Sequence, residues 1–211
     1  MEKPVIILGA GRIGQAALDI FESNGVSVYC FLDDDKELHG TEIGEVSVLG
    51  AIDDDKLLGQ IGPKTGAFVA SDENKFRKSL VEMLRDRDVM PVNAIHSTAF
   101  ISESAPIGHG NMFDTGVLIN SGATIGNHCL LFSGSVIDHN AKVEDFVQIG
   151  PGSIIGSGAV ISESAFIGAG VTVVGGVTIG KKARVGAGSV VVSDVKNNET
   201  VFGNPAKGIE K

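Results

Sequence analysis

Five histidines are the side chains of this protein best suited to act as a base near neutral pH: His39, His96, His109, His128 and His139. An imidazole gains or loses a proton in that range, as general-base catalysis requires. His139 lies two residues after Ile137 and two before Ala141, and both neighbours are expected to point into a core. The side chain of His139 is therefore predicted to point outward, where a substrate can reach it.

The other four histidines lack such a setting. His109 and His128 also occupy outward positions but no motif surrounds them, and His39 and His96 fall in connecting segments. We interpret all four as non-catalytic. A zinc site would need three suitably spaced ligands, and the spacing of His128, His139 and Glu144 does not supply them, so no metal site is predicted.

A glycine-rich turn near the start of the chain has the chemistry of a phosphate cradle. Residues 5–8 form a continuous apolar run, typical of a buried strand, and enter the GxGxxG turn at 9–14. Residues 15–23 are predicted to be helical, and a second strand at 26–32 ends in the acids 33–35. Strand, glycine turn, helix, strand and terminal acid predict the mononucleotide-binding half of a Rossmann-like fold. The first helical amides would face a phosphate, and an acid after the second strand can accept from a ribose hydroxyl.

The same turn occurs in NAD-binding proteins, but a complete dinucleotide fold does not fit this chain. Such a fold needs two βαβαβ halves. Only about ninety residues precede the next domain, and nothing in that domain offers a nicotinamide site. One half-fold holds one nucleotide, so we predict a nucleotide-linked small molecule as the ligand.

A six-residue period organises residues 95–196. Counted from Ile95, seventeen consecutive hexads carry an apolar residue at position one, without an insertion. Position five is Ala, Val, Ser or Cys except at Asn111, and position two is often glycine, which we interpret as supplying costly backbone angles. A period of six fits neither a helix nor a flat strand, but it does fit short strands joined by tight corners and stacked coil on coil.

Composition and charge narrow the function classes. The 211 residues predict one or two domains, and we place boundaries at 1–94, 95–196 and a tail at 197–211. The net charge is −9, Trp is absent and no basic stripe exists, which argues against nucleic acid and anionic membranes. Cys30 and Cys129 are expected to be packed thiols in a reducing compartment, and the first apolar run is too short for a membrane segment. We therefore expect a cytoplasmic enzyme.

The order of the two modules resembles the hexapeptide-repeat nucleotide-sugar acetyltransferases of the bacillosamine pathway (PglD-type) and the related NeuD-type sialic acid O-acetyltransferases. The turn at 9–14, the Phe-Leu-Asp-Asp at 31–34 and the Gly-Asn-Pro-Ala-Lys at 203–207 match that family. The resemblance implies a half-Rossmann domain followed by a left-handed parallel β-helix with three hexads per coil. It also implies acetyl-CoA as co-substrate and a homotrimer with its active sites between subunits.

The resemblance also implies roles for single residues. It makes His139 the general base, followed by Asn140 where relatives have an acid. It places the nucleotide sugar at Gly9, Gly11, Arg12, Ile13, Gly14, Asp33 and Asp34, and acetyl-CoA along Gln148, Ala169 and Ala187. Lys181, Lys182, Arg184 and Lys207 are either contacts for the CoA phosphates or solvated corners.

Three departures bear on the base. Asn140 cannot support His139 as a charge, Gln148 replaces a second family histidine, and Phe132 replaces an asparagine. Ile13 also stands where most relatives have a histidine. His139 would then rely on Asp138, on another carboxylate, or on an amine substrate that is already partly deprotonated.

The sequence thus predicts an acetyl-CoA-dependent N-acetyltransferase for the 4-amino group of a nucleotide-linked sugar, with UDP as the expected nucleotide. Two alternatives stay open: O-acetylation of a sialic-type sugar, and a non-catalytic subunit that binds a nucleotide sugar. A hydroxyl acceptor needs a stronger base than an amine, and Asn140 speaks against that alternative.

Overall fold

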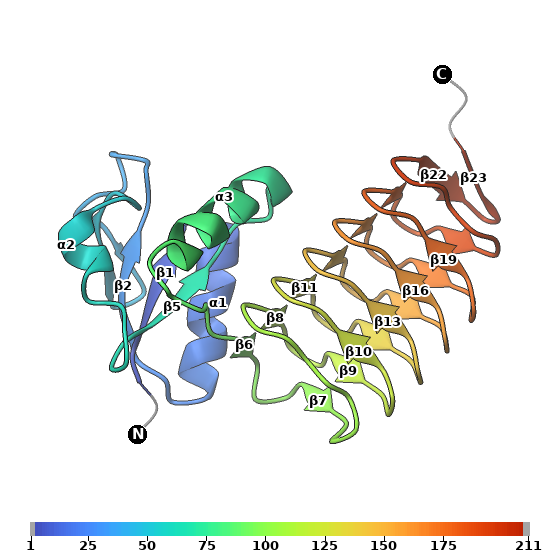
Figure 1. Ribbon diagram of the computed structural model, residues 1–211, viewed down its shortest axis with the longest axis horizontal. Helices are drawn as coiled ribbons and strands as arrows, with labels where there is room; N and C mark the ends of the chain where they lie inside the picture. The colour runs from blue at the N-terminus through green and yellow to red at the C-terminus, as the bar shows by residue number, and fades with distance from the viewer. Residues whose placement is uncertain (1–2, 209–211) are drawn as a thin grey trace. The chain divides into compact units, whose positions relative to one another are not determined.

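The computed structural model describes residues 3–208 and divides into two units, with the division after Ser97. The first unit is an α/β domain and the second a β-helix (Figure 1). None of the helices within residues 3–208 is both long and apolar enough to cross a membrane.

The first unit is built on a five-stranded sheet in the order β3-β4-β2-β1-β5, parallel except where β3 meets β4. Its strands are β1 (Val5–Leu8), β2 (Val28–Leu32), β3 (Glu42–Ile43), β4 (Val46–Gly50) and β5 (Gly66–Val69). Its helices are α1 (Arg12–Ser23), α2 (Asp55–Leu58) and α3 (Asn74–Arg85), and β6 (Ala94–Ile95) follows. The predicted half-Rossmann fold is confirmed.

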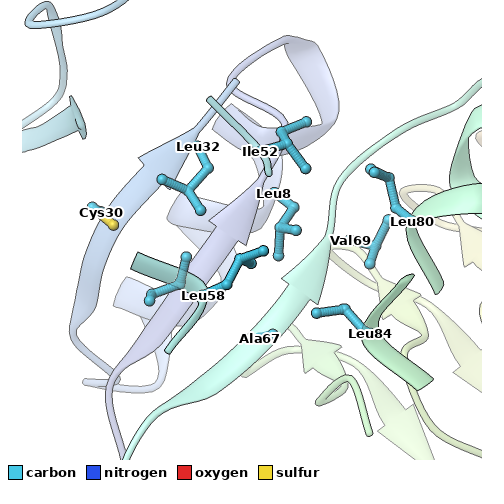
Figure 2. Close-up of a cluster of buried hydrophobic side chains, with 10 residues drawn as sticks. Leu8, Cys30, Leu32, Ile52, Leu58, Ala67, Val69, Leu80 and Leu84 are labelled. Atoms are coloured by element: carbon cyan, nitrogen blue, oxygen red, sulfur yellow. The ribbon is translucent and has the colours of Figure 1, made fainter. Parts of the chain in front are cut away.

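The core of this unit explains the continuous apolar runs of its central strands. Figure 2 shows Leu8 of β1, Leu32 of β2 and Val69 of β5 facing one side of the sheet, with Leu80 and Leu84 of α3 among the side chains that cover it. Every residue of β1 and β5 is buried, because helices cover both faces of a parallel sheet. Burial raises the pKa of the Cys30 thiol to about 11, so this cysteine is a neutral packed side chain.

The second unit is a left-handed parallel β-helix with three faces, as predicted. The β12 face holds β7 (Phe100–Ile101), β9 (Leu118–Ile119), β12 (Val136–Ile137), β15 (Ile154–Ile155), β18 (Thr172–Val173) and β21 (Val190–Val191). The β13 face holds β10 (Thr124–Ile125), β13 (Lys142–Val143), β16 (Val160–Ile161) and β19 (Thr178–Ile179). The β14 face holds β8 (Met112–Phe113), β11 (Leu130–Leu131), β14 (Gln148–Ile149), β17 (Phe166–Ile167), β20 (Arg184–Val185), β22 (Thr200–Gly203) and β23 (Ala206–Gly208).

The register of these faces shows three hexads per coil. Ile125 pairs with Val143, Val143 with Ile161, and Ile161 with Ile179, each eighteen residues on. Position one points inward along each column; these residues are buried from Phe113 to Val191, whereas Ile101 and Ile107 in the first coil are half-buried. Residues 200–208 add the antiparallel hairpin of β22 and β23 to the β14 face, with β22 paired to β20.

Asn111, the one exception at position five, is buried inside the prism without leaving its amide unsatisfied. Its Nδ2 donates to the carbonyl of Gly126 at 3.0 Å, and its Oδ1 accepts from the amide of Cys129 at 2.7 Å. A buried polar group is tolerated when it is hydrogen-bonded in this way. Asn111 therefore ties two neighbouring coils together from within.

The structure gives a different reason for the glycines at position two from the one that the sequence pattern predicts. The left-handed backbone angle occurs at position four, in all fourteen hexads from Gly110 to Gly188, whereas the position-two glycines of this run have no such angle. A Cβ on Gly150 would lie 2.6 Å from the amide nitrogen of Ala169, and one on Gly168 equally close to that of Ala187. At Gly150 and Gly168 the backbone of the next coil therefore passes too close for a side chain.

Candidate active site

The glycine turn leaves the first turn of α1 open to a ligand. Gly11 is the N-cap, it offers no side-chain hydrogen bond, and no acid lies in the first turn. The first amides of a helix have no partner within the helix and carry partial positive charge. The turn itself is held by the amide of Gly9, which donates to the carbonyl of Leu32 at 2.8 Å. The N-terminal end of α1 therefore has the donors that a phosphate needs.

A pocket of about 190 Å³ opens at this turn. Five of the seven residues predicted to bind the nucleotide sugar line it: Gly9, Gly11, Arg12, Ile13 and Asp33. The remaining lining comes from the chain after β5, namely Ala70, Ser71 and Asp72 in the connecting segment and Phe76 in the first turn of α3, which the sequence prediction missed. A signal was available, since β1, β2 and β5 are parallel neighbours whose carboxyl ends meet at one edge of the sheet.

Asp33 holds the turn as well as lining the pocket. Its Oδ2 accepts from the amide of Ala10 at 2.7 Å and its Oδ1 from the amide of Asp35 at 2.9 Å. Each carboxylate oxygen keeps a second acceptor site, so Asp33 can also accept from a ligand hydroxyl. Asp34 is exposed, accepts from the amide of Ile52 at 3.1 Å and does not line the pocket.

Arg12 and Asp72 form an ion pair at the pocket, with 3.1 Å between Nη2 and Oδ2. The Arg12 side chain is 90% exposed, so the pair is weak and the guanidinium is available to a phosphate. The segment that carries Asp72 is held in place by Arg77, a buried residue that is 1% exposed. Arg77 donates to the carbonyl of Ser71 at 2.6 Å and to the Asn74 side chain at 2.5 Å.

The outer glycines of the turn, Gly9 and Gly14, have no room for a side chain, whereas Gly11 does. Alanine at Gly14 should therefore affect folding, and alanine at Gly11 should affect ligand binding. A Cβ on Gly14 would collide with the carbonyl of Gly9, whereas a Cβ on Gly11 meets nothing within 4 Å and faces the pocket that Gly11 lines. We expect Gly11→Ala to keep the melting temperature within a few degrees and to weaken nucleotide binding at least tenfold, measured by calorimetry. Gly14→Ala, the matched control, should lower the melting temperature of the first unit. Undiminished affinity in Gly11→Ala would place the nucleotide elsewhere.

His139 lies at the corner between the β12 face and the β13 face, with 56% of its side chain exposed, and the predicted outward orientation is what the structure shows. Its Nδ1 is 2.9 Å from Oγ of Ser121, one coil earlier. Its Nε2 is 3.8 Å from Oδ1 of Asp138, which is within ion-pair distance but beyond a hydrogen bond. The ring is thus held at one nitrogen and presented at the other.

Asp138 brings a negative charge to this corner. Ser157 donates to its Oδ2 at 2.6 Å and Asn120 to its Oδ1 at 3.0 Å. The Ser157 hydrogen bond, the main chain of His139 and the Asn120 amide hold the pKa of Asp138 below its usual value. A carboxyl with a lowered pKa stabilises the folded state at neutral pH and loses that contribution as the pH falls through the lowered value. Asp138 is therefore ionised wherever His139 acts as a base.

Asn140 occupies the corner position with the left-handed backbone, φ 57°. Asn adopts this conformation more readily than most residues with a Cβ. The backbone amide of Asn140 donates to the carbonyl of Ser121 at 3.2 Å. The Asn140 side chain lies where a Cβ on Gly122 would be. The structure thus accounts for Asn at this position by backbone geometry.

The residues predicted for the co-substrate lie on and beside the β14 face. Gln148 is on β14, and Ala169 and Ala187 are exposed at one corner, eighteen residues apart and therefore stacked. The backbone between them is in register, because the carbonyl of Ala169 accepts from Gly188 at 2.8 Å. Gln148 is 5% exposed, whereas Ala169 and Ala187 form a column of small exposed side chains along which an extended chain can lie.

The basic side chains of this region differ in the contacts that they make within the protein. Lys181 is paired with Glu163 at 2.6 Å, and the guanidinium of Arg184 lies 4.4 Å above the ring of Phe166. Such stacking fixes an arginine and leaves its edge donors available to an anion. Lys182 sits at a left-handed corner and Lys207 is exposed on β23.

His109 and His128 differ from solvated corner residues. The ring of His128 is buried, stacks on Phe146 at 4.9 Å between centroids and meets the ring of His109 edge-on at 4.8 Å. This packing gives both histidines a structural role.

A larger hollow of about 550 Å³ lies on the β13 face, and none of the predicted site residues lines it. Three carboxylates border it: Glu144, Asp145 and Glu163. Lys142 and Lys181 pair with the first and the last of these. Within residues 3–208, no group of three or more His, Cys, Asp or Glu side chains is arranged to hold a metal ion.

Comparison with protein families identifies both units. The PglD N-terminal domain matches residues 4–84, and the bacterial transferase hexapeptide repeat matches residues 130–163 and 158–193. No curated protein matches the chain in sequence.

Solved structures extend the likeness to the whole chain. Perosamine N-acetyltransferase from Caulobacter crescentus, crystallised with CoA and GDP-perosamine, is 32% identical over 100% of this chain and 99% of that one, with a TM-score of 0.90. The chain belongs to the PglD-type family of hexapeptide-repeat acetyltransferases. The acetyltransferase domain of PglB from Neisseria gonorrhoeae, in complex with acetyl coenzyme A, is 26% identical over 99% of this chain and 100% of that one, with a TM-score of 0.91.

Membership of the PglD-type family confirms the resemblance that the turn, the acids and the hexads carry, and it makes the chain an acyltransferase. The assignment of roles to His139, Asn140 and the ligand-binding residues stays a prediction.

Proposed function

We propose that this acyltransferase uses acetyl-CoA to acetylate the 4-amino group of a nucleotide-linked amino-deoxy sugar. The observation that carries the proposal is His139: an exposed imidazole, held at Nδ1 by Ser121 and flanked by an ionised carboxylate, on a β-helix corner. The relative that was crystallised with CoA and GDP-perosamine supports both the amine and the nucleotide. It also adds GDP to UDP, our sequence-based expectation, as a nucleotide to be tested.

The reaction needs one base and one set of oxyanion donors. The sugar amine attacks the thioester carbonyl carbon while His139 takes a proton from the nitrogen. The tetrahedral oxyanion accepts hydrogen bonds from backbone amides. Collapse breaks the carbon–sulfur bond, and the departing CoA thiolate receives the proton from the imidazolium. The products are the acetamido sugar, CoA with a free thiol and an unchanged enzyme.

The nucleotide would occupy the pocket at the glycine turn. Its diphosphate binds the open amides of α1 with Arg12, which exchanges Asp72 for the phosphate. A ribose hydroxyl donates to the free acceptor site of Asp33. The local donors attract the anion although the chain as a whole carries −9.

We also propose that the β-helix forms a homotrimer with its active sites between subunits. The outward residues of the β12 face are almost all apolar: Phe100, Leu118, Val136, Ile154, Thr172 and Val190. Phe100 is 59% exposed and Ile154 45% exposed. A contiguous apolar stripe of this kind marks an interaction surface. His139 lies at the corner where this face ends, so a neighbouring subunit on the stripe would wall the imidazole on one side.

A charge on the stripe tests the assembly. We expect Ile154→Glu to dissociate the trimer at micromolar concentration and to lower activity at least tenfold, because a carboxylate would be buried without a partner. Val160→Glu is the matched control, since it also replaces a β-branched apolar residue with glutamate at the equivalent outward position of the β13 face. Sedimentation velocity measures the mass of each. An Ile154→Glu protein that remains an active trimer would exclude the β12 face as the interface.

The function itself is tested by thiol release from acetyl-CoA with a panel of acceptors: UDP-linked and GDP-linked 4-amino sugars, their hydroxyl counterparts and sialic acid. We expect release with a 4-amino sugar nucleotide and one acetyl group added to the product by mass spectrometry. Release with hydroxyl acceptors alone would favour O-acetylation. Binding of a sugar nucleotide without release for any acceptor would favour a non-catalytic binding subunit.

A further inference from the structure

A polar cluster stacks on three successive coils around the imidazole. Asn120 and Ser121 lie on one coil, Asp138 and His139 eighteen residues later, and Ser157 eighteen residues after His139. The β-helix brings the same hexad positions into register on each coil, so these side chains form a column on the corner beside the β12 face. This column differs from the family pattern, in which an acid that follows the base supports it.

The contacts of the imidazole within this cluster are few and clear. The only hydrogen bond to the ring among residues 3–208 is the one between Ser121 Oγ and Nδ1, at 2.9 Å. Asp138 is 3.8 Å from Nε2 and supplies charge without a hydrogen bond, and it is the one carboxylate in that part of the chain within ion-pair distance of the ring. Asn140 points instead toward the backbone at Gly122.

We propose that Ser121 is the positioning residue for His139, in place of the missing acid, which deepens the proposed function and rests on it. The Ser121 oxygen accepts from Nδ1–H and keeps the ring in one orientation and one tautomer. The lone pair of Nε2 is then the one that takes the substrate proton. The Asp138 carboxylate, anchored by Asn120 and Ser157, lies beside Nε2 and stabilises the positive charge when that proton arrives.

In the family pattern one acid next to the base both orients the imidazole and stabilises its positive charge. Here these two roles belong to residues on two different coils. A hydroxyl supplies orientation and a carboxylate supplies charge. The hydroxyl is on the previous coil, where Ser121 lies eighteen residues before His139, and the Asn140 side chain lies against Gly122 instead of the ring. The carboxylate sits one residue before the base, where Asn120 and Ser157 from the adjoining coils can hold it.

The tautomer of His139 can be read directly, without turnover, from the nitrogen chemical shifts of the ring in protein labelled at histidine. We expect the neutral ring to carry its proton on Nδ1, and Ser121→Ala to shift the population toward the Nε2–H form. A wild-type ring protonated on Nε2, or a population unchanged in Ser121→Ala, would overturn the proposal. This readout stands even if no acceptor is found, so its failure is distinct from failure of the proposed function.

Kinetics give the second readout. Ser121→Ala should lower kcat on the order of tenfold with KM unchanged, and shift the acid limb of the kcat/KM profile down by roughly half to one pH unit, because the imidazolium loses an acceptor. Ser121→Thr, which keeps the hydroxyl, should restore most of the rate. Ser193→Ala is the matched control, an exposed serine at the same hexad position four coils after Ser121. An unshifted profile in Ser121→Ala would leave that serine a purely structural role.

Discussion

Replacing His139 with alanine should lower the rate of acetyl transfer by about 10²–10⁴-fold and leave binding of the nucleotide sugar intact. The loss has a simple cause, since the attacking amine would have to release its proton to water. Binding should persist because the pocket at the glycine turn belongs to the first unit, whereas His139 belongs to the second. Thiol release measures the rate, and calorimetry with the product nucleotide measures the binding.

Two further variants separate loss of the base from damage to the corner. His109→Ala removes another histidine at hexad position three, on a different corner, and should keep the wild-type rate. Added imidazole should restore part of the activity of His139→Ala, because a small base can enter the space that the side chain leaves. A His139→Ala enzyme at full rate would remove this residue from the mechanism.

The fold is nearly all present in the sequence, for a physical reason. A β-helix has one repeating unit, and each hexad must bury an apolar residue at position one and fit a small one at position five. The same sequence requirement for this fold is therefore repeated in seventeen hexads. The first unit is almost as explicit, since the apolar run at β1, the glycine turn and the acids after β2 follow one another directly along the chain.

The candidate site was less predictable where it depends on residues distant in the chain. Asp33 is predictable from its place after a strand, whereas Asp72 and Phe76 come to the same pocket from the chain that follows β5. The partner of His139 was equally hidden: Ser121 becomes its neighbour only because one coil contains eighteen residues. The period, once known, would have pointed to Ser121, since residues eighteen apart stack.

The role of glycine shows how a correct pattern can be given the wrong cause. The sequence pattern predicts unusual backbone angles at position two, yet the structure has those angles at position four, where Asn140 and Lys182 also adopt them. What the glycines at position two lack is room for a side chain. Sequence periodicity shows which positions are constrained but not whether the backbone or a neighbouring coil imposes the constraint.

This distinction predicts that the same substitution costs much more stability at Gly156 than at Gly158. A Cβ on Gly156 would lie 2.6 Å from the amide nitrogen of Gly175 and 2.7 Å from the carbonyl of Val173. Gly158 has φ +67° and nothing within 4 Å. We expect Gly156→Asn to cost about 3 kcal/mol or more, because the coils must separate. We expect Gly158→Asn to cost less than about 1 kcal/mol, because Asn tolerates the left-handed region.

Both proteins should be unfolded at the same concentration, since an oligomer gains stability by mass action. For a chain of this size, about 3 kcal/mol corresponds to a fall in melting temperature of roughly 6–12 °C, which calorimetry resolves easily. The other possible results are also informative. Equal losses at the two sites would mean that clearance between coils does not select glycine at position two. A larger loss at Gly158 would return the cause to the backbone angle, as the sequence pattern alone had indicated.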